Sequence, residues 1–75
     1  MKAFVMINTN LGSEPEVEAE LKKIPGVTGV YQVYGVYDIV IEVEAPTDLE
    51  LKNAVFSKIR TLRNVRSTLT LATVS

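Results

Sequence analysis

The sequence contains no cysteine, no histidine and no tryptophan. Without cysteine no disulfide can form, and without cysteine and histidine the usual ligands of a structural zinc ion are missing. The same absences remove the thiol nucleophile and the imidazole base on which many enzymes depend. A domain of 75 residues buries only a modest share of its surface, so it needs a closely packed core or association with other chains. We therefore expect self-association, with no metal and no cofactor.

Charge and hydropathy exclude further classes of function. The formal net charge is −1, whereas a nucleic-acid-binding domain usually presents a strongly basic surface. No apolar run approaches the ~18 residues that a membrane span requires, and the N-terminus lacks the layout of a signal peptide. We expect a cytoplasmic protein that contacts neither nucleic acid nor membrane.

Apolar periodicity and capping residues divide the chain into six elements. Ser13 and Glu16 have the spacing of a capping box at a helix start, and Thr47 and Glu50 repeat it. Between them, Gly35 has the place of a first turn residue in a two-residue hairpin. The expected elements are a strand at 3–9, a helix between Ser13 and Pro25, strands at 27–34 and 37–44, a helix between Thr47 and Asn64, and a strand at 65–74.

This β-α-β-β-α-β order predicts an α+β, ferredoxin-like sandwich formed by a single domain over residues 1–75. Two right-handed crossovers place both helices on one face of a four-stranded antiparallel sheet. Alternation along the strands assigns one set of residues to the helix-facing core. That set is Ala3, Val5, Ile7, Tyr31, Val33, Ile39, Ile41, Val43, Leu69 and Leu71.

The opposite face of the predicted sheet is at least half apolar. A sheet face left in water usually carries polar residues, and an exposed apolar patch of this kind marks an interface. Packing two such sheets face to face would bury both patches in a dimeric α+β barrel. The expected interface residues are Phe4, Met6, Val30, Tyr34, Val40, Ala72 and Val74.

Polar groups near the hairpin match the requirements of a free amino acid. Asp38 can accept a hydrogen bond from an ammonium group, and Gly35 lets backbone amides approach a ligand. Hydroxyls at Ser67, Thr68 and Thr70 could bind a carboxylate. The alternative is a hairpin in which the aspartate binds nearby backbone N–H groups.

A row of carboxylates follows the same hairpin. Asp38, Glu42 and Glu44 are expected on one strand face, where they could bind a cation. A solvated or interfacial face is the favoured interpretation of the row, so we expect no metal site.

Two segments resemble the effector domain of the Lrp/AsnC transcription regulators, called RAM for regulation of amino acid metabolism. The hairpin in "VYQVYGVYDIVIEVE" has the form apolar-x-x-G-x-[YF]-D-apolar, matched by Tyr34, Gly35, Tyr37 and Asp38. The terminal "VRSTLTLATV" has V-x-x-[ST]-x-[ST] character. Together the two segments, with "IPGVTGVYQVYG" before the hairpin, extend the resemblance over essentially the whole chain.

The resemblance implies a set of functional expectations. Such domains dimerise through their sheets and assemble into rings of dimers, commonly octamers or decamers, with amino acids bound in clefts between dimers. The ligand-binding residues carried over are Gly35, Tyr37, Asp38, Thr68 and Thr70. Tyr31 is then expected in the core and Tyr34 at the interface.

Full-length members carry an N-terminal helix-turn-helix domain, but here the first strand begins at residue 3. We therefore expect a stand-alone, non-enzymatic amino-acid sensor, which could act through mixed assemblies with full-length regulators or could buffer or report amino-acid levels through other contacts. Two alternatives stay open. One is a dimeric α+β barrel enzyme of the monooxygenase kind, and the other is a structural assembly module without a ligand.

Overall fold

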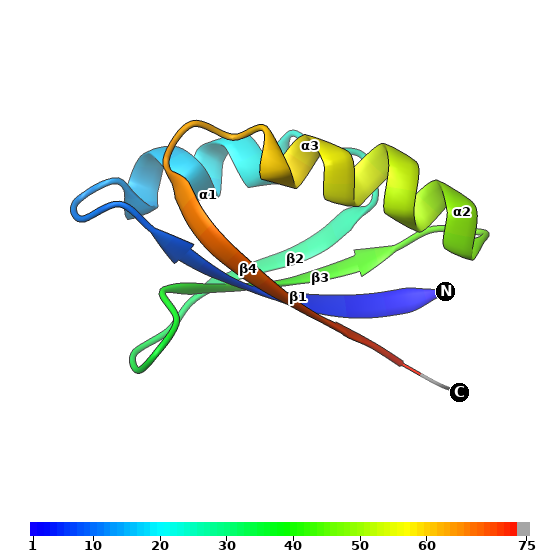
Figure 1. The fold of residues 1–75 in the computed structure, drawn as a ribbon, viewed down its shortest axis with the longest axis horizontal. Helices are drawn as coiled ribbons and strands as arrows, with labels where there is room; N and C mark the ends of the chain where they lie inside the picture. Colours follow the sequence, from blue (N-terminus) through cyan, green and yellow to red (C-terminus); the bar gives the residue numbers. More distant parts are fainter. Residues whose placement is uncertain (74–75) are drawn as a thin grey trace.

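The computed structural model describes residues 1–73 and contains one antiparallel sheet covered on one face by helices (Figure 1). The strand order is β2-β3-β1-β4, so the first and third strands lie in the centre. This arrangement confirms the predicted α+β, ferredoxin-like fold. The elements are β1 (Lys2–Thr9), α1 (Glu14–Lys22), β2 (Val27–Gln32), β3 (Ile39–Glu44), α2 (Asp48–Glu50), η1 (Leu51–Phe56), α3 (Ser57–Arg60) and β4 (Val65–Ala72).

The core lies between the helices and the two central strands. In α1 and in the continuous helical segment 48–60, apolar residues three or four positions apart share one face, which packs on the sheet. In β1 and β3 every second residue faces the helices. The buried apolar residues are Ala3, Val5, Ile7, Val17, Leu21, Ile24, Ile39, Ile41, Val43, Leu51, Val55 and Ile59.

The two predicted capping boxes have different outcomes. Thr47 is extended and its hydroxyl accepts the Glu50 N–H at 3.1 Å, as predicted. Ser13 has φ −100° and ψ 5°, which is not the extended conformation of a capping residue, and it makes no side-chain cap. Its hydroxyl instead donates to the Asn10 carbonyl at 2.6 Å. The predicted box at Ser13 is therefore wrong, and Glu16 is left available for another partner.

The predicted two-residue hairpin is also wrong. β2 ends at Gln32 and β3 begins at Ile39, so residues 33–38 form a longer loop. The Asp38 carbonyl accepts the Val33 N–H at 2.9 Å and the Asp38 N–H donates to the Ile7 carbonyl of β1 at 3.0 Å, so the loop is closed at Val33 and Asp38 rather than at Tyr34 and Tyr37. Tyr34 consequently lies outside the sheet and is fully exposed.

In the outer strand β2, the side chains predicted to face the helices point to the uncovered face of the sheet, and those predicted to point away face the helices. Val30 is opposite Ile41 and packs against the core, whereas Tyr31 is opposite Val40 on the uncovered face. The register of this pair shifts between Val27 and Gly29. Such an irregularity changes which alternate residues face the core. Tyr31 is therefore not a core residue, and the predicted core residue Val33 lies in the loop.

In the last strand β4, too, the residues that face the helices are the ones predicted to face away from them. Thr70 is opposite the buried Val5, while Leu69 and Leu71 are opposite Met6 and Phe4 on the uncovered face. By the same register Ala72 is opposite Ala3, on the helix side rather than at the predicted interface. The β1–β4 register shifts between Asn8 and Thr9. Val74, another predicted interface residue, lies outside the described residues.

Candidate ligand and assembly surfaces

The loop 33–38 holds three of the five predicted ligand residues side by side. Gly35 has φ +134° and open space around it, Tyr37 is half-buried, and Asp38 is half-buried at the start of β3. A positive φ of this size favours glycine, so Gly35 allows a loop conformation that a residue with a side chain would rarely adopt. The structure thus brings Gly35, Tyr37 and Asp38 together.

Asp38 is held by the end of β1. Its Oδ2 accepts the backbone N–H of Thr9 at 2.8 Å and the Thr9 hydroxyl at 3.4 Å. Thr9 itself is buried. Asp38 therefore binds a backbone N–H group, which was one of the two interpretations of this residue. Both bonds end on Oδ2, so a ligand ammonium group would have to use Oδ1.

This geometry predicts different results for two substitutions of Asp38. Asp38→Ala removes the acceptor of a buried N–H and is expected to lower the free energy of unfolding by about 1–3 kcal/mol. Asp38→Asn keeps an oxygen acceptor for Thr9, so its loss should stay within about 1 kcal/mol. Urea unfolding of both variants measures the difference. Equal destabilisation by the two would show that the hydrogen bond to Thr9 is not the cause.

The two predicted ligand threonines lie elsewhere in the sheet. Thr68 and Thr70 are on the helix-facing side of β4, and Thr70 lines a depression of about 440 Å³ that also contains Lys52 and Arg60. Strand β1 separates β4 from β3, and two strand spacings amount to about 10 Å. One protomer therefore does not gather Asp38 and the threonines around one small molecule.

The uncovered side of the sheet is an apolar surface, which we call the open face. Phe4, Tyr31, Leu69 and Leu71 retain 37%, 57%, 44% and 47% exposure. The Tyr31 ring lies back over Gly29, where a Cβ atom would come within 2.9 Å of its hydroxyl. The open face consists of Phe4 and Met6 from β1, Tyr31 from β2, Val40 from β3, and Leu69 and Leu71 from β4.

One end of the open face carries an ion-pair cluster. The Lys2 ammonium lies 2.9 Å from Glu42 and 3.7 Å from Glu44. The hydrogen bond and charge of Glu42, with the charge of Glu44, raise the pKa of Lys2 above its ordinary value. Asp38, the third member of the predicted row of carboxylates, precedes β3 and does not belong to this cluster. Residues 1–73 contain no group of acidic side chains suited to hold a metal ion, and none of their helices could span a membrane.

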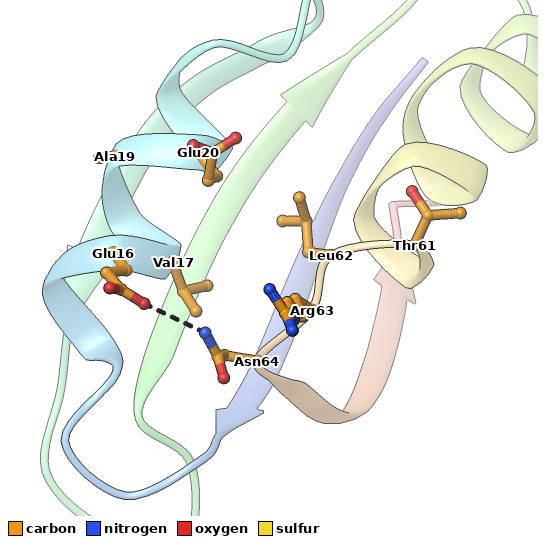
Figure 2. A pocket seen from close by; sticks show the side chains of 8 residues that line it. All are labelled: Glu16, Val17, Ala19, Glu20, Thr61, Leu62, Arg63 and Asn64. Carbon is orange, nitrogen blue, oxygen red and sulfur yellow. Dashed lines mark hydrogen bonds between the residues drawn. The ribbon is translucent and has the colours of Figure 1, made fainter.

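The sequence did not predict a groove of about 460 Å³ that lies between α1 and the connection from α3 to β4 (Figure 2). Its lining residues are Glu16, Val17, Ala19, Glu20, Thr61, Leu62, Arg63 and Asn64. The residues of its two walls are 41 to 48 positions apart in the sequence, and no local pattern indicates that residues so distant will meet.

Comparison with known proteins identifies the family. Residues 2–75 match the sequence profile of the Lrp/AsnC ligand binding domain. The chain belongs to the Lrp/AsnC family. It is 36% identical over 72 residues to an uncharacterized HTH-type transcriptional regulator of Pyrococcus furiosus, covering 92% of this chain and 48% of that protein. The chain thus spans about half the length of this curated relative.

Solved structures of other proteins have the same fold. A hypothetical protein of Pyrococcus horikoshii is 35% identical with a TM-score of 0.89, covering 99% of this chain and 90% of that one. AsnC of E. coli is 28% identical with a TM-score of 0.90, covering 99% of this chain and 50% of that one. A homocitrate synthase of Sulfurisphaera tokodaii is 44% identical over 54 residues, which are 72% of this chain but 12% of that enzyme.

Proposed function

We propose that this chain is a self-associating effector domain that binds a free amino acid and thereby modulates Lrp/AsnC-type transcription regulation. The observation that carries the proposal is the match of residues 2–75 to the family's ligand binding domain. The loop 33–38 supports it, because a carboxylate beside a glycine and a half-buried tyrosine can bind an ammonium group next to an apolar wall.

The proposed assembly begins with two open faces packed against each other. A two-fold interface uses the same surface of both copies, and an apolar sheet face is complementary to itself. Burial of a few hundred Å² at roughly 25 cal/mol per Å² contributes several kcal/mol, comparable with the whole stability of a small domain. Phe4, Met6 and Val40 keep their predicted place in this interface, while Tyr31, Leu69 and Leu71 replace Val30, Tyr34 and Ala72.

We place the amino-acid site between dimers of a ring, which would be an octamer or a decamer. The position of β1 between β3 and β4 supports this placement, because two strand spacings of about 10 Å in total separate the strand that follows Asp38 from the strand that holds Thr68. In the proposed site one protomer contributes Gly35, Tyr37 and Asp38. A neighbouring protomer contributes Thr68 and Thr70.

The proposed role is neither catalytic nor dependent on direct DNA contact. The lack of histidine and cysteine, together with a net charge of −1, supports both parts of this proposal. Regulation would then pass through mixed assemblies with full-length Lrp/AsnC regulators, whose matching domains would offer the same sheet surface. Co-expression with such a regulator, followed by separation of the assemblies by mass, tests the mixed assembly directly.

Thermal unfolding against the twenty amino acids at millimolar concentration tests ligand binding. A ligand at about 100 times its Kd adds roughly 2.7 kcal/mol to the free energy of unfolding, which shifts the Tm of a domain this small by several degrees. We expect one amino acid, or a few related ones, to give such a shift, and we expect Asp38→Asn to remove the part of the shift that comes from the cleft between dimers. If no amino acid shifts the Tm while the wild-type protein is still assembled, amino-acid binding would be contradicted, and a role in assembly alone would remain.

A further inference from the structure

The groove between α1 and the α3–β4 connection has the size and chemistry of a small-molecule site. Its volume of about 460 Å³ falls within the ~300–1,000 Å³ of typical ligand pockets. Val17 and Leu62 both line the groove, and Leu62, which is half-buried, offers more apolar surface than Val17, which is 3% exposed. Acidic side chains line the α1 wall, and Arg63 belongs to the facing connection (Figure 2).

A network of hydrogen bonds through Asn64 holds one of the groove's carboxylates in place. The Asn64 side-chain amide donates to Glu16 Oε2 at 3.2 Å. The Asn64 Oδ1 in turn accepts from the side chain of Asn10 at 3.2 Å, and the Asn10 N–H donates to the Asn64 carbonyl at 2.9 Å. Glu16 is thus anchored to the loop after β1 instead of capping its own helix, and a fixed carboxylate binds a ligand at a lower entropic cost.

The charges on the two walls are opposite in sign and remain free to pair with a ligand. Within residues 1–73 neither Glu16 nor Arg63 belongs to an ion pair, and Glu20 makes only a long, exposed contact of 3.5 Å with Lys23. Figure 2 shows Arg63 on the connection that faces α1 across the groove. A guanidinium group binds a carboxylate in a bidentate manner, and a carboxylate binds an ammonium group.

We infer that this groove binds a small zwitterion carrying one ammonium group, one carboxylate and an apolar substituent. Glu16 and Glu20 take the ammonium, Arg63 takes the carboxylate, and Val17 and Leu62 contact the apolar part. All five residues come from one protomer, so the site is complete without assembly. It is separate from the proposed cleft between dimers and does not depend on it.

Three matched probes test the inference: L-leucine, 4-methylpentanoate, which lacks the ammonium group, and 3-methylbutylamine, which lacks the carboxylate. Calorimetric titration gives the affinities, and methyl resonances of Val17 and Leu62 report on the groove while those of Val36 report on the loop 33–38. We expect leucine to shift the Val17 and Leu62 resonances saturably. Each singly charged probe should bind at least about five-fold more weakly, as should leucine to Glu16→Gln or Arg63→Met.

The variants have matched controls. Glu16→Gln keeps an oxygen that accepts from Asn64, so the anchoring network stays intact while the charge is lost. Glu14→Gln removes a charge from the same helix outside the groove, and Arg66→Met does the same on β4; both should bind leucine as the wild type does. Groove shifts that are absent, or unchanged by Glu16→Gln and Arg63→Met, would overturn the inference. Shifts of Val36 alone, removed by Asp38→Asn, would overturn it too while supporting the cleft between dimers.

Discussion

Leu71→Lys is expected to convert the protein from an assembly to a monomer at micromolar concentration. Leu71 lies opposite Phe4 on the open face and is 47% exposed in the single chain. In a two-fold dimer each copy would bring a lysine into an apolar interface, and burial of each unpaired ammonium group costs several kcal/mol. A loss of about 4 kcal/mol weakens dimerisation roughly 1,000-fold. Light scattering coupled to size-exclusion chromatography over a range of concentrations measures the change.

Leu49→Lys is the matched control for this substitution. Leu49 is also an exposed leucine, with 68% of its surface accessible, but it lies on α2 on the other side of the sheet. Its replacement should leave the mass of the assembly unchanged. A wild-type protein that is already monomeric, or a Leu71→Lys variant that keeps the wild-type mass, would refute pairing through the open face.

Gly26→Ala is expected to lower the free energy of unfolding by about 2–6 kcal/mol. Gly26 has φ +101°, a conformation that costs a residue with a side chain about 1–3 kcal/mol. An added Cβ would also come within 2.8 Å of Val55 Cγ2 and 3.1 Å of the Glu44 carbonyl oxygen. Val55 is buried and Glu44 belongs to β3, so neither can move without disturbing the core; such overpacking costs a further ~1–3 kcal/mol.

Gly12→Ala separates the two contributions. Gly12 has φ +81°, but a Cβ there meets nothing within 4 Å. Only backbone strain remains, so this variant should lose about 1–2 kcal/mol, in the range of a single left-handed residue. Urea unfolding of both variants, at a concentration where the wild type keeps one assembly state, measures the difference. Equal losses would show that the contact with Val55 is not important.

The central strands and the helices were predictable because their local patterns are unambiguous. Ile39, Ile41 and Val43 alternate with residues that include two glutamates, so only one face of β3 can be buried. The outer strands gave no such signal. In β2 the neighbours Val30 and Tyr31 are both apolar, although they point to opposite faces of the sheet. In β4 apolar residues also occur on both faces: Leu69 and Leu71 on one, Ala72 on the other. The register shifts that determine which residues of β2 and β4 face the helices arise where these strands pair with β3 and β1.

The sequence by itself determined the elements, their order, the central core and the Gly35–Asp38 segment that marks the family, since each follows from contacts a few residues apart. The tertiary structure decided which side of β2 and β4 faces the helices. It also joined Asp38 to Thr9, and Glu16 to Asn64, 48 positions away. A hydrogen bond between distant residues is as strong as one between neighbours. The packing of the helices on the sheet determines which distant residues form such a bond, and the local periodicity of the sequence does not indicate them.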